Sequence, residues 1–573
     1  MSRLHSCFLF IILLTAACSQ ELPSQVPTLN PLLLLPPPTP QVIPGASLAA
    51  AVPTATPTVA KTTVVITTVA PTPVPAQNPD YYLVAEPGVP AEILADAGQM
   101  ATLNPRRFAW NSESGDAENS VRFAVNDGLS LAQWDYAVAA PFATIVDDTT
   151  IAEITAGWQA GSNHLGSLIV DENTAAALTH IWGPPGPGSR IVLQNELSQA
   201  LWTARPSWTI IPFHRLSPEL KVLRLDGMSP LAADFDRTVY PLTISIGLTG
   251  DLNGVAQVQS TWSGHRSNRD PERLSTVAMS GVTALGRATA FQMEIGGITT
   301  PGLVVGPVLQ AADIAHISHE VAFAPDCPYP NPIGDPIFCA RDSYLALLQS
   351  LGTDLVELTG NHVNDWGAAN LLHSIELYEL ASMETFGGGR NLADAGAAAL
   401  FEHHGNKIAF VGCNPVGPAF AWATEGGAGS NPCNYEAFYN QIRQLRDNGY
   451  LVIATLQYFE FYHYAPTAQQ QVDFRALAEA GAAVVSGSQG HHAQGFDLYN
   501  GAFIHYGLGN LFFDQMDMLG TRQSFIDTYT IYDGALINVD LFTSLIENYC
   551  CPREMSTAER QQLLQAVFQA SGW

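Results

Sequence analysis

The chain has 573 residues and carries 24 Lys and Arg against 52 Asp and Glu, a formal net charge of −28. At roughly 100–200 residues per domain, this length predicts two or three domains. The acidic charge argues against nucleic acid as a partner, because each phosphate contact requires a cation that replaces a released counterion. Only three residues are lysines, and none stands in the Gly-Lys-Ser/Thr triplet of a nucleotide-binding P-loop, which excludes Walker-type nucleotide hydrolysis.

The first eighteen residues are typical of an export signal. Arg3 supplies a positive charge, residues 8–14 form an apolar run, and small residues lead to Cys18. The run is shorter than the roughly 20 residues that span a bilayer. Small residues before a cysteine resemble the lipobox of bacterial lipoproteins, although Thr15 stands where leucine is usual. We expect an exported chain, lipid-anchored at Cys18 on the outer face of the bacterial cell membrane; a plain cleaved signal peptide is the alternative.

Residues 19–79 form a segment rich in Pro, Thr, Val and Ala with very few charges. Its repeated Thr-Pro steps disfavour helices and strand ladders and favour an extended chain. We interpret this segment as a tether between the membrane anchor and the folded part of the protein.

Export permits disulfide bonds, and six cysteines follow the signal region. We predict that Cys327 pairs with Cys339 and Cys413 with Cys433, because each pair would close a loop rich in Pro and Gly. The adjacent cysteines at 550–551 are left unassigned, since a bond between neighbours is strained and neither has an obvious distant partner.

From about residue 80 the chain has the pattern of an α/β domain. Short apolar runs predict strands, and apolar residues recurring at intervals of three and four predict a helix over residues 149–159. The predicted strands are residues 137–145, 167–170, 190–193, 209–212 and 222–225. A polar, turn-rich stretch over residues 251–274 marks a plausible domain boundary.

The end of this region shows a distinctive order of segments. Trp208-Thr-Ile-Ile-Pro-Phe213 precedes Leu223-Arg-Leu-Asp-Gly227, which precedes Tyr240-Pro-Leu-Thr-Ile244. This order resembles the closing stretch of periplasmic phosphate-binding-type solute receptors. The resemblance implies a separate solute-binding-like α/β domain over residues 80–262; an unrelated α/β domain is the alternative.

A second α/β run begins at about residue 275 and continues to the end of the chain. A helix is predicted over residues 368–382. Ten of the fifteen histidines follow residue 300, and several stand where predicted strands end, which is where α/β proteins place their chemistry. The predicted strands are residues 276–280, 354–358, 407–412, 450–458, 482–486 and 502–508.

Two stretches of this second run are specific: Leu358-Thr-Gly-Asn-His-Val-Asn-Asp-Trp-Gly367 and Ile504-His-Tyr-Gly-Leu-Gly-Asn510. With Ser318-His-Glu320 and Gly487-Ser-Gln-Gly-His-His492, they resemble in order the poly-γ-glutamate capsule synthesis (CapA) family, a branch of the calcineurin-like metallophosphoesterase fold. The resemblance implies a metallophosphoesterase-like αββα sandwich over residues 275–573. It also implies a role in exopolymer synthesis, with an envelope polymer or its precursor as partner.

In that family the site is expected to hold two metal ions, which clamp an oxyanion and generate a hydroxide nucleophile. Carried over by position, Glu320, Asn361 and His491 match metal ligands. His362 matches the adjacent histidine that acts on the leaving group or oxyanion. Imidazole and carboxylate ligands suit Mn, Fe or Zn.

Three further ligand positions depart from the family pattern. Val282 stands where the family has an aspartate after its first strand, and Gln457 where it has the histidine of a His-Trp-Gly motif. A histidine pair before the last ligand falls on Ser488 and Gln489. We therefore expect at most one divalent metal ion per chain and weak phosphodiesterase activity.

Each matched residue also has a plainer interpretation. Asn361 and Asn364 would serve as caps of the following helix, Glu320 would be an exposed charge, and His491 would be a loop residue without a ligand role. Two functions follow from these alternatives. The protein is either a metal-dependent hydrolase or transferase of the cell envelope, or a non-catalytic binding or assembly factor. A tethered solute-binding protein is the weaker third alternative.

Overall fold

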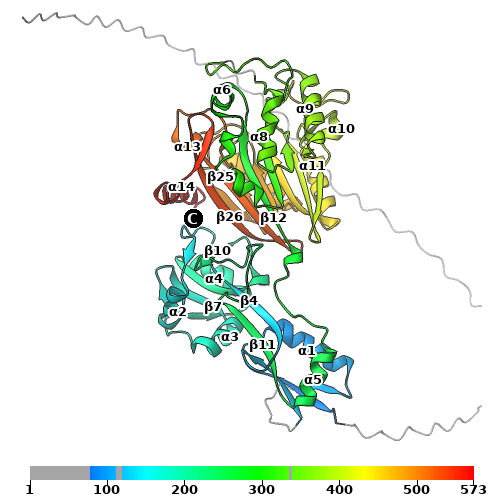
Figure 1. Cartoon of the computed structure of the whole chain (residues 1–573), viewed down its shortest axis with the longest axis vertical. Helices are drawn as coiled ribbons and strands as arrows, with labels where there is room; N and C mark the ends of the chain where they lie inside the picture. Colours follow the sequence, from blue (N-terminus) through cyan, green and yellow to red (C-terminus); the bar gives the residue numbers. More distant parts are fainter. Residues whose placement is uncertain (1–77, 111–118, 335–337) are drawn as a thin grey trace, which may run out of the picture. The chain divides into compact units, whose positions relative to one another are not determined.

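The computed structural model describes residues 78–110, 119–334 and 338–573 (Figure 1). The predicted signal peptide, Cys18 and the tether up to residue 77 lie outside the described residues. Within the described ranges, no helix has both the length and the apolarity that a membrane crossing requires. Residues 76–573 make up one compact unit.

The first part of this unit contains an 11-stranded sheet, all of whose strands come from residues 81–250. The main path of the sheet is β2 (Phe108–Trp110), β1 (Tyr81–Ala85), β3 (Ser120–Val125), β11 (Thr243–Gly250), β4 (Leu129–Pro141), β9 (Ser207–Pro212), β7 (Gly166–Asp171) and β6 (Ser162–Asn163). Off this path lie β5 (Asp148–Thr149), β8 (Arg190–Val192) and β10 (Leu220–Leu225). The helices are α1 (Ala91–Leu103), α2 (Ile151–Ala160), α3 (Glu172–Trp182), α4 (Leu197–Thr203) and α5 (Leu252–Thr261).

The predicted strands of this region are present, and the first of them differs most in its bounds. The strand predicted over residues 137–145 is the second half of β4, which begins at Leu129 and ends at Pro141. Proline has no N–H group to donate to a ladder, so the strand stops there. The hydrophobic core of the region includes Trp134, Trp158 and Trp208, all of which are fully buried.

The second part of the unit contains two larger sheets. The 8-stranded sheet consists of β15 (Glu384–Phe386), β14 (Leu355–Glu357), β13 (Ile314–His319), β12 (Leu274–Thr283), β25 (Gln523–Tyr532), β26 (Ala535–Glu547) and β27 (Cys551–Glu554), with β24 (Asn510–Phe512) beside β12. The 6-stranded sheet consists of β17 (Ala399–His403), β18 (Asn406–Cys413), β20 (Leu451–Leu456), β21 (Val484–Gly487), β23 (Ala502–His505) and β22 (Phe496–Tyr499). A two-stranded ribbon pairs β16 (Gly388–Gly389) with β19 (Gly429–Ser430).

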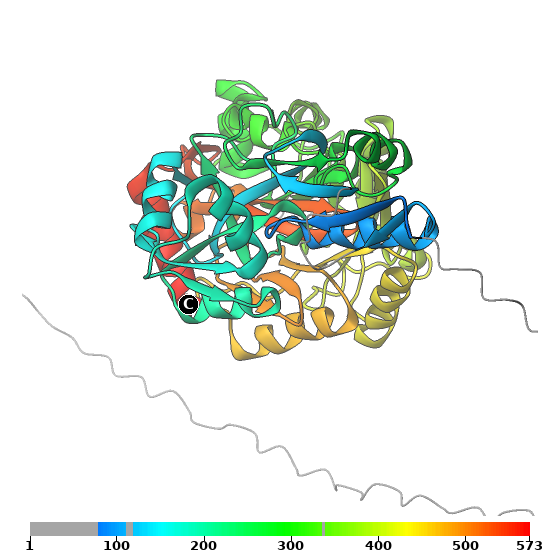
Figure 2. The same ribbon diagram turned by 90° about the horizontal axis from the view of Figure 1, so that it is seen from below.

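Nine helices of the described residues belong to this second part. They are α6 (Arg287–Gly296), α7 (Gly306–Gln310), α8 (Leu345–Ser350), α9 (Ala368–Leu380), α10 (Leu392–Ala395), α11 (Tyr435–Asp447), α12 (Ala468–Ala480), α13 (Leu519–Arg522) and α14 (Thr557–Ala570). Figure 2 shows the green helices that follow β12 and the yellow helices α11 and α12 on opposite sides of the strands.

Side chains alternate between two faces along a strand, so each sheet here contributes to two hydrophobic clusters. Met279 of β12 and Ile453 of β20 belong to one cluster between the two sheets. Ala278, on the other face of β12, packs in a cluster with residues of α6 to α9. Val452, on the other face of β20, packs with residues of α11 and α12. These clusters define four layers and confirm the predicted αββα sandwich.

Both predicted disulfides are present, joining Cys327 to Cys339 and Cys413 to Cys433. The adjacent cysteines left unassigned, at 550–551, are bonded to each other. The antiparallel pair β25–β26 was not predicted, although its two-residue turn, Asp533-Gly534, has positive φ at both positions and is a common hairpin signal.

Candidate functional site

The predicted site residues lie in loops that follow the carboxyl ends of parallel strands. Strands β12, β13 and β14 run parallel in one sheet, and β18, β20 and β21 run parallel in the other. Loops at such ends are where α/β folds assemble binding sites. The residues and the strands they follow are Glu320 after β13, Asn361 and His362 after β14, Gln457 after β20, and Gln489 and His491 after β21.

Glu320 is buried, with 2% of its surface exposed, and neither carboxylate oxygen has a hydrogen-bond partner. Its backbone lies against Gly360, where an added Cβ would stand 2.5 Å from the Cβ of Glu320. Burial raises the pKa of Glu320 above its usual range, and the nearby His491 and His362 offset only part of this effect. The alternative in which Glu320 is an exposed surface charge is therefore wrong.

His362 is held by a carboxylate from its own loop. Its Nδ1 lies 2.8 Å from Oδ2 of Asp365, and the same oxygen accepts a hydrogen bond of 2.9 Å from the backbone N–H of Phe338. Burial by itself lowers the pKa of His362, but the hydrogen bond to Asp365 and the charge of Glu320 outweigh it, so that the pKa is raised. The pair resembles an oriented imidazole of the kind that serves in proton transfer.

Three amide side chains are connected directly to one another at the ligand positions. Nε2 of Gln457 donates to Oδ1 of Asn361 at 3.2 Å and also to Oε1 of Gln489. Oγ of Ser488 donates to Oε1 of Gln457 at 3.1 Å, and Nε2 of Gln489 donates to Oε1 of Glu460 at 3.2 Å. Hydrogen bonds within the protein therefore engage the side chains at positions where the family pattern has metal ligands.

His491 is buried and fixed by its neighbours. Its Nδ1 lies 2.8 Å from Oδ1 of Asn510, whose Nδ2 donates to the backbone oxygens of His491 and Thr521. Its Nε2 lies 3.8 Å from Oε1 of Glu460, and its ring packs on Phe513 with 4.6 Å between ring centroids. Asn510, the last residue of the second specific motif, thus orients the imidazole.

The asparagines after β14 do not cap the next helix. Helix α9 begins at Ala368 with Gly367 at its N-cap, and no side chain caps it. Asn364 instead donates to the backbone oxygens of Phe420 and Ala428, at 3.0 Å and 2.9 Å. The capping alternative is therefore wrong for both Asn361 and Asn364.

The donor set does not fit a dinuclear metal centre. Val282 is buried in β12 and offers no donor atom. Over the described ranges of the chain, no group of three or more His, Cys, Asp or Glu side chains is arranged to hold a metal ion. Among the matched positions, Glu320 and His491 offer the strong metal ligands. The ligand atom of Asn361 would be Oδ1, which already accepts a hydrogen bond. His316, a conceivable replacement ligand, is instead bound to Glu357 at 3.1 Å.

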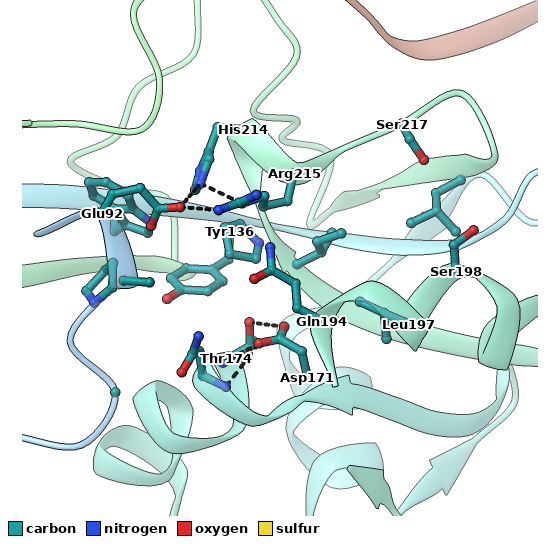
Figure 3. Close-up of a pocket in the computed structure, with 18 residues that line it drawn as sticks. Glu92, Tyr136, Asp171, Thr174, Gln194, Leu197, Ser198, His214, Arg215 and Ser217 are labelled. Carbon is teal, nitrogen blue, oxygen red and sulfur yellow. Dashed lines mark hydrogen bonds and ion pairs between the residues drawn. The ribbon is translucent and has the colours of Figure 1, made fainter. Parts of the chain in front are cut away.

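A second site was missed by sequence reasoning. A cavity of about 130 Å³ lies within residues 88–220 and is lined by Glu92, Tyr136, Asp171 and His214, among others (Figure 3). The sequence offers one signal for this cavity, because Asp171 is an acidic residue that stands between a strand and a helix. The convergence of the four residues depends on long-range contacts that no local pattern reveals.

The second part of the chain is thus an αββα sandwich with a polar site at the carboxyl ends of its parallel strands. Residues 276–515 match the model of the family described as bacterial capsule synthesis protein PGA_cap. This segment therefore belongs to the PGA_cap/CapA family, as the sequence motifs predicted.

Two relatives each match part of the chain. The capsule biosynthesis protein CapA of Bacillus anthracis is 26% identical over 280 residues, covering 48% of this chain and 68% of the relative. The PGA biosynthesis protein CapA of Bacillus subtilis is 24% identical over 237 residues, covering 41% of this chain and 62% of the relative. The chain thus spans less than two thirds of the second relative.

Solved structures show weaker likenesses. An ABC-type phosphate transport receptor from Vibrio cholerae has 10% identity and a TM-score of 0.27, covering 32% of this chain and 93% of the receptor. The NAD nucleotidase of Haemophilus influenzae has 12% identity and a TM-score of 0.30, covering 52% of this chain and 56% of the nucleotidase.

Proposed function

We propose that this chain is a cell-envelope protein of capsule or exopolymer synthesis, of the poly-γ-glutamate type, with a partly degenerate metallophosphoesterase-type site. The observation that carries the proposal is Glu320, a buried carboxylate without a hydrogen-bond partner inside the PGA_cap segment. A group of this kind is costly to bury, and such groups concentrate at functional sites. The names of the two relatives supply the class of polymer.

The chemistry of the site favours neutral polar groups over a phosphoryl group. Phosphoryl transfer depends on cations that stabilise the oxygens. Here the nearby guanidinium of Arg287 is already paired with Asp514, with 3.0 Å between Nε and Oδ2. Amides such as Gln457 and Gln489 suit the amide and carboxyl groups of a peptide-like polymer. Glu320 and His362 are the groups that would exchange protons with the ligand.

We propose that this site binds at most one divalent metal ion, which would be Mn, Fe or Zn. Glu320, Asn361 and His491 would hold it, and when bound it would polarise an oxygen of the ligand. With an ion bound, Glu320 would serve as a deprotonated ligand, and proton transfer would fall to His362.

The second candidate function is a non-catalytic binding or assembly factor. It is supported by the hydrogen bonds among Asn361, Gln457 and Gln489, which join the amides to one another. In this alternative the site recognises the polymer without changing it. For either function we also propose export and lipid anchoring at Cys18, which places the site outside the cell membrane.

The two functions are separated by a deletion and rescue experiment. Deleting the gene in its bacterial host should abolish surface polymer, and the intact gene should restore it. Glu320→Gln should fail to restore the polymer if the site is catalytic and should restore it if the protein is only an assembly factor. Glu479→Gln, which changes an exposed carboxylate bonded to Tyr499, is the matched control and should restore it in both cases. Unchanged polymer after deletion would contradict the proposed function.

A further inference from the structure

The cavity in the first part of the chain is lined by the N-terminal ends of three helices and by two aromatic side chains. Residues from the first turns of α1, α3 and α4 line it, and so do Trp134 and Tyr136 of β4. Its volume of about 130 Å³ is roughly ten times what one water molecule requires. It therefore accommodates a ligand of several heavy atoms.

Asp171 contributes a buried negative charge to this cavity. Its surface is 4% exposed, and among the described residues no cation is paired with it. One oxygen accepts hydrogen bonds of 3.0 Å from the backbone N–H groups of Asn173 and Thr174, and the other accepts one of 2.6 Å from Oγ1 of Thr174. A carboxylate has about four acceptor positions, so one remains for a ligand. Carboxylates are rarely buried without a compensating cation.

Tyr136 places a second free polar group at the same cavity. Its side chain is 2% exposed, and within the described part of the chain its hydroxyl has no hydrogen-bond partner. Figure 3 shows its ring between Glu92 on one side and Asp171 with Thr174 on the other. Together with Trp134, which is 1% exposed, it forms an aromatic wall. Aromatic faces attract cations as well as apolar groups.

The start of α3 and the side chains of His214 and Arg215 at the cavity already have carboxylate partners within the chain. Asp171 takes the free N–H groups at the start of α3. Glu92, in the first turn of α1, lies 2.9 Å from Nε2 of His214 and is paired with Arg215. Helix N-termini and guanidinium groups are features that bind phosphate, and here Asp171 already caps α3 and Glu92 is already paired with Arg215. An anionic ligand would also have to approach Asp171.

We propose that this cavity binds a small organic cation, a protonated primary amine on an apolar or aromatic body. The ammonium group donates to the open position of the Asp171 carboxylate and to the hydroxyl oxygen of Tyr136. The body of the ligand packs against Trp134 and Ile211, which also lines the cavity. Binding supplies the positive charge that the protein does not provide for Asp171. This inference is independent of the function proposed for the PGA_cap segment.

The test is isothermal titration of the full chain with phenethylammonium chloride and, separately, with inorganic phosphate. We expect one phenethylammonium per chain and no binding of phosphate. Asp171→Asn removes the charge but keeps a residue that caps helices well. It should weaken amine binding by about tenfold or more, since a hydrogen bond to a charged group is lost.

Two further variants complete the design. Asp251→Asn makes the same change at the N-cap of α5, where Asp251 accepts from the backbone N–H of Gly254, and it should leave the affinity unchanged. Tyr136→Phe removes the hydroxyl with little change in the shape of the cavity, and it should weaken amine binding. This variant tests the proposal if Asp171→Asn does not fold. The proposal is overturned by phosphate binding at this cavity, by no amine binding up to about 10 mM, or by equal affinity in the wild type and the folded variants.

Discussion

Nδ1 of His362 lies 2.8 Å from Oδ2 of Asp365, three residues further along the loop that follows β14. The exposed fraction of the Asp365 side chain is 5%, so solvent screens this pair only weakly. The hydrogen bond orients the imidazole and favours its protonated form, which prepares His362 for proton transfer at the site.

Replacing Asp365 with Asn should lower the pKa of His362, because the neutral amide no longer stabilises the imidazolium. The imidazole resonances followed by NMR as a function of pH measure this change. Asp342→Asn is the matched control, since Asp342 pairs with a different histidine, His373. An unchanged titration of His362 in Asp365→Asn would show that Asp365 does not set its protonation.

The metal content of protein purified without chelator should be one ion per chain or fewer. Val282, Gln457 and Gln489 stand where strong ligands are expected, and weak or absent donors cannot replace most of the water shell of a second cation. Elemental analysis measures the ratio, and turnover of a generic phosphodiester should be far below that of an intact dinuclear enzyme. Two tightly bound ions, both lost in His491→Ala, would restore the metallohydrolase hypothesis.

The mature chain should begin at a lipid-modified Cys18. Mass spectrometry of the N-terminal peptide from the membrane fraction measures this modification directly. Cys18→Ser should release the protein from the membrane fraction, while its fold remains intact. A mature N-terminus at any other residue would contradict the lipid anchor and leave a plain signal peptide.

The ion pair between Asp147 and Arg560 should stabilise the protein in a pH-dependent manner. Burial by itself raises the pKa of Asp147, but Arg560 and Lys221 outweigh it and lower the pKa to about 2. A lowered pKa contributes stability that is present above the unfolded value near 4 and is lost as the pH falls towards 2. Asp147→Asn should therefore cost about 2 kcal/mol at pH 7 and almost nothing near pH 2.

Urea midpoints of the wild type and Asp147→Asn, compared from pH 7 down to pH 2, measure this dependence. Asp148→Asn is the control, because Asp148 and its partner Arg224 are both more than half exposed and such pairs contribute little. A destabilisation of Asp147→Asn that is equally large at both ends of the pH range would argue against the electrostatic explanation.

The sequence by itself predicted many of the helices and strands. Strands such as 407–412 and the helix at 368–382 follow from the local periodicity of apolar residues, which depends only on neighbours in the chain. The pairs Cys327–Cys339 and Cys413–Cys433 are close in sequence, so loop composition was enough to predict them. The order of the CapA-like motifs predicted the αββα sandwich.

Only the tertiary structure decided how the site residues are surrounded. From the sequence alone, Glu320 was compatible with an exposed surface charge or with a metal ligand. Its burial depends on strands and loops that are distant in sequence. The same holds for the amine-binding cavity that we propose, where Glu92 meets His214 across 122 positions of the chain. Burial, hydrogen-bond partners and shifted pKa values are properties of long-range packing, and a local pattern of residue types does not encode them.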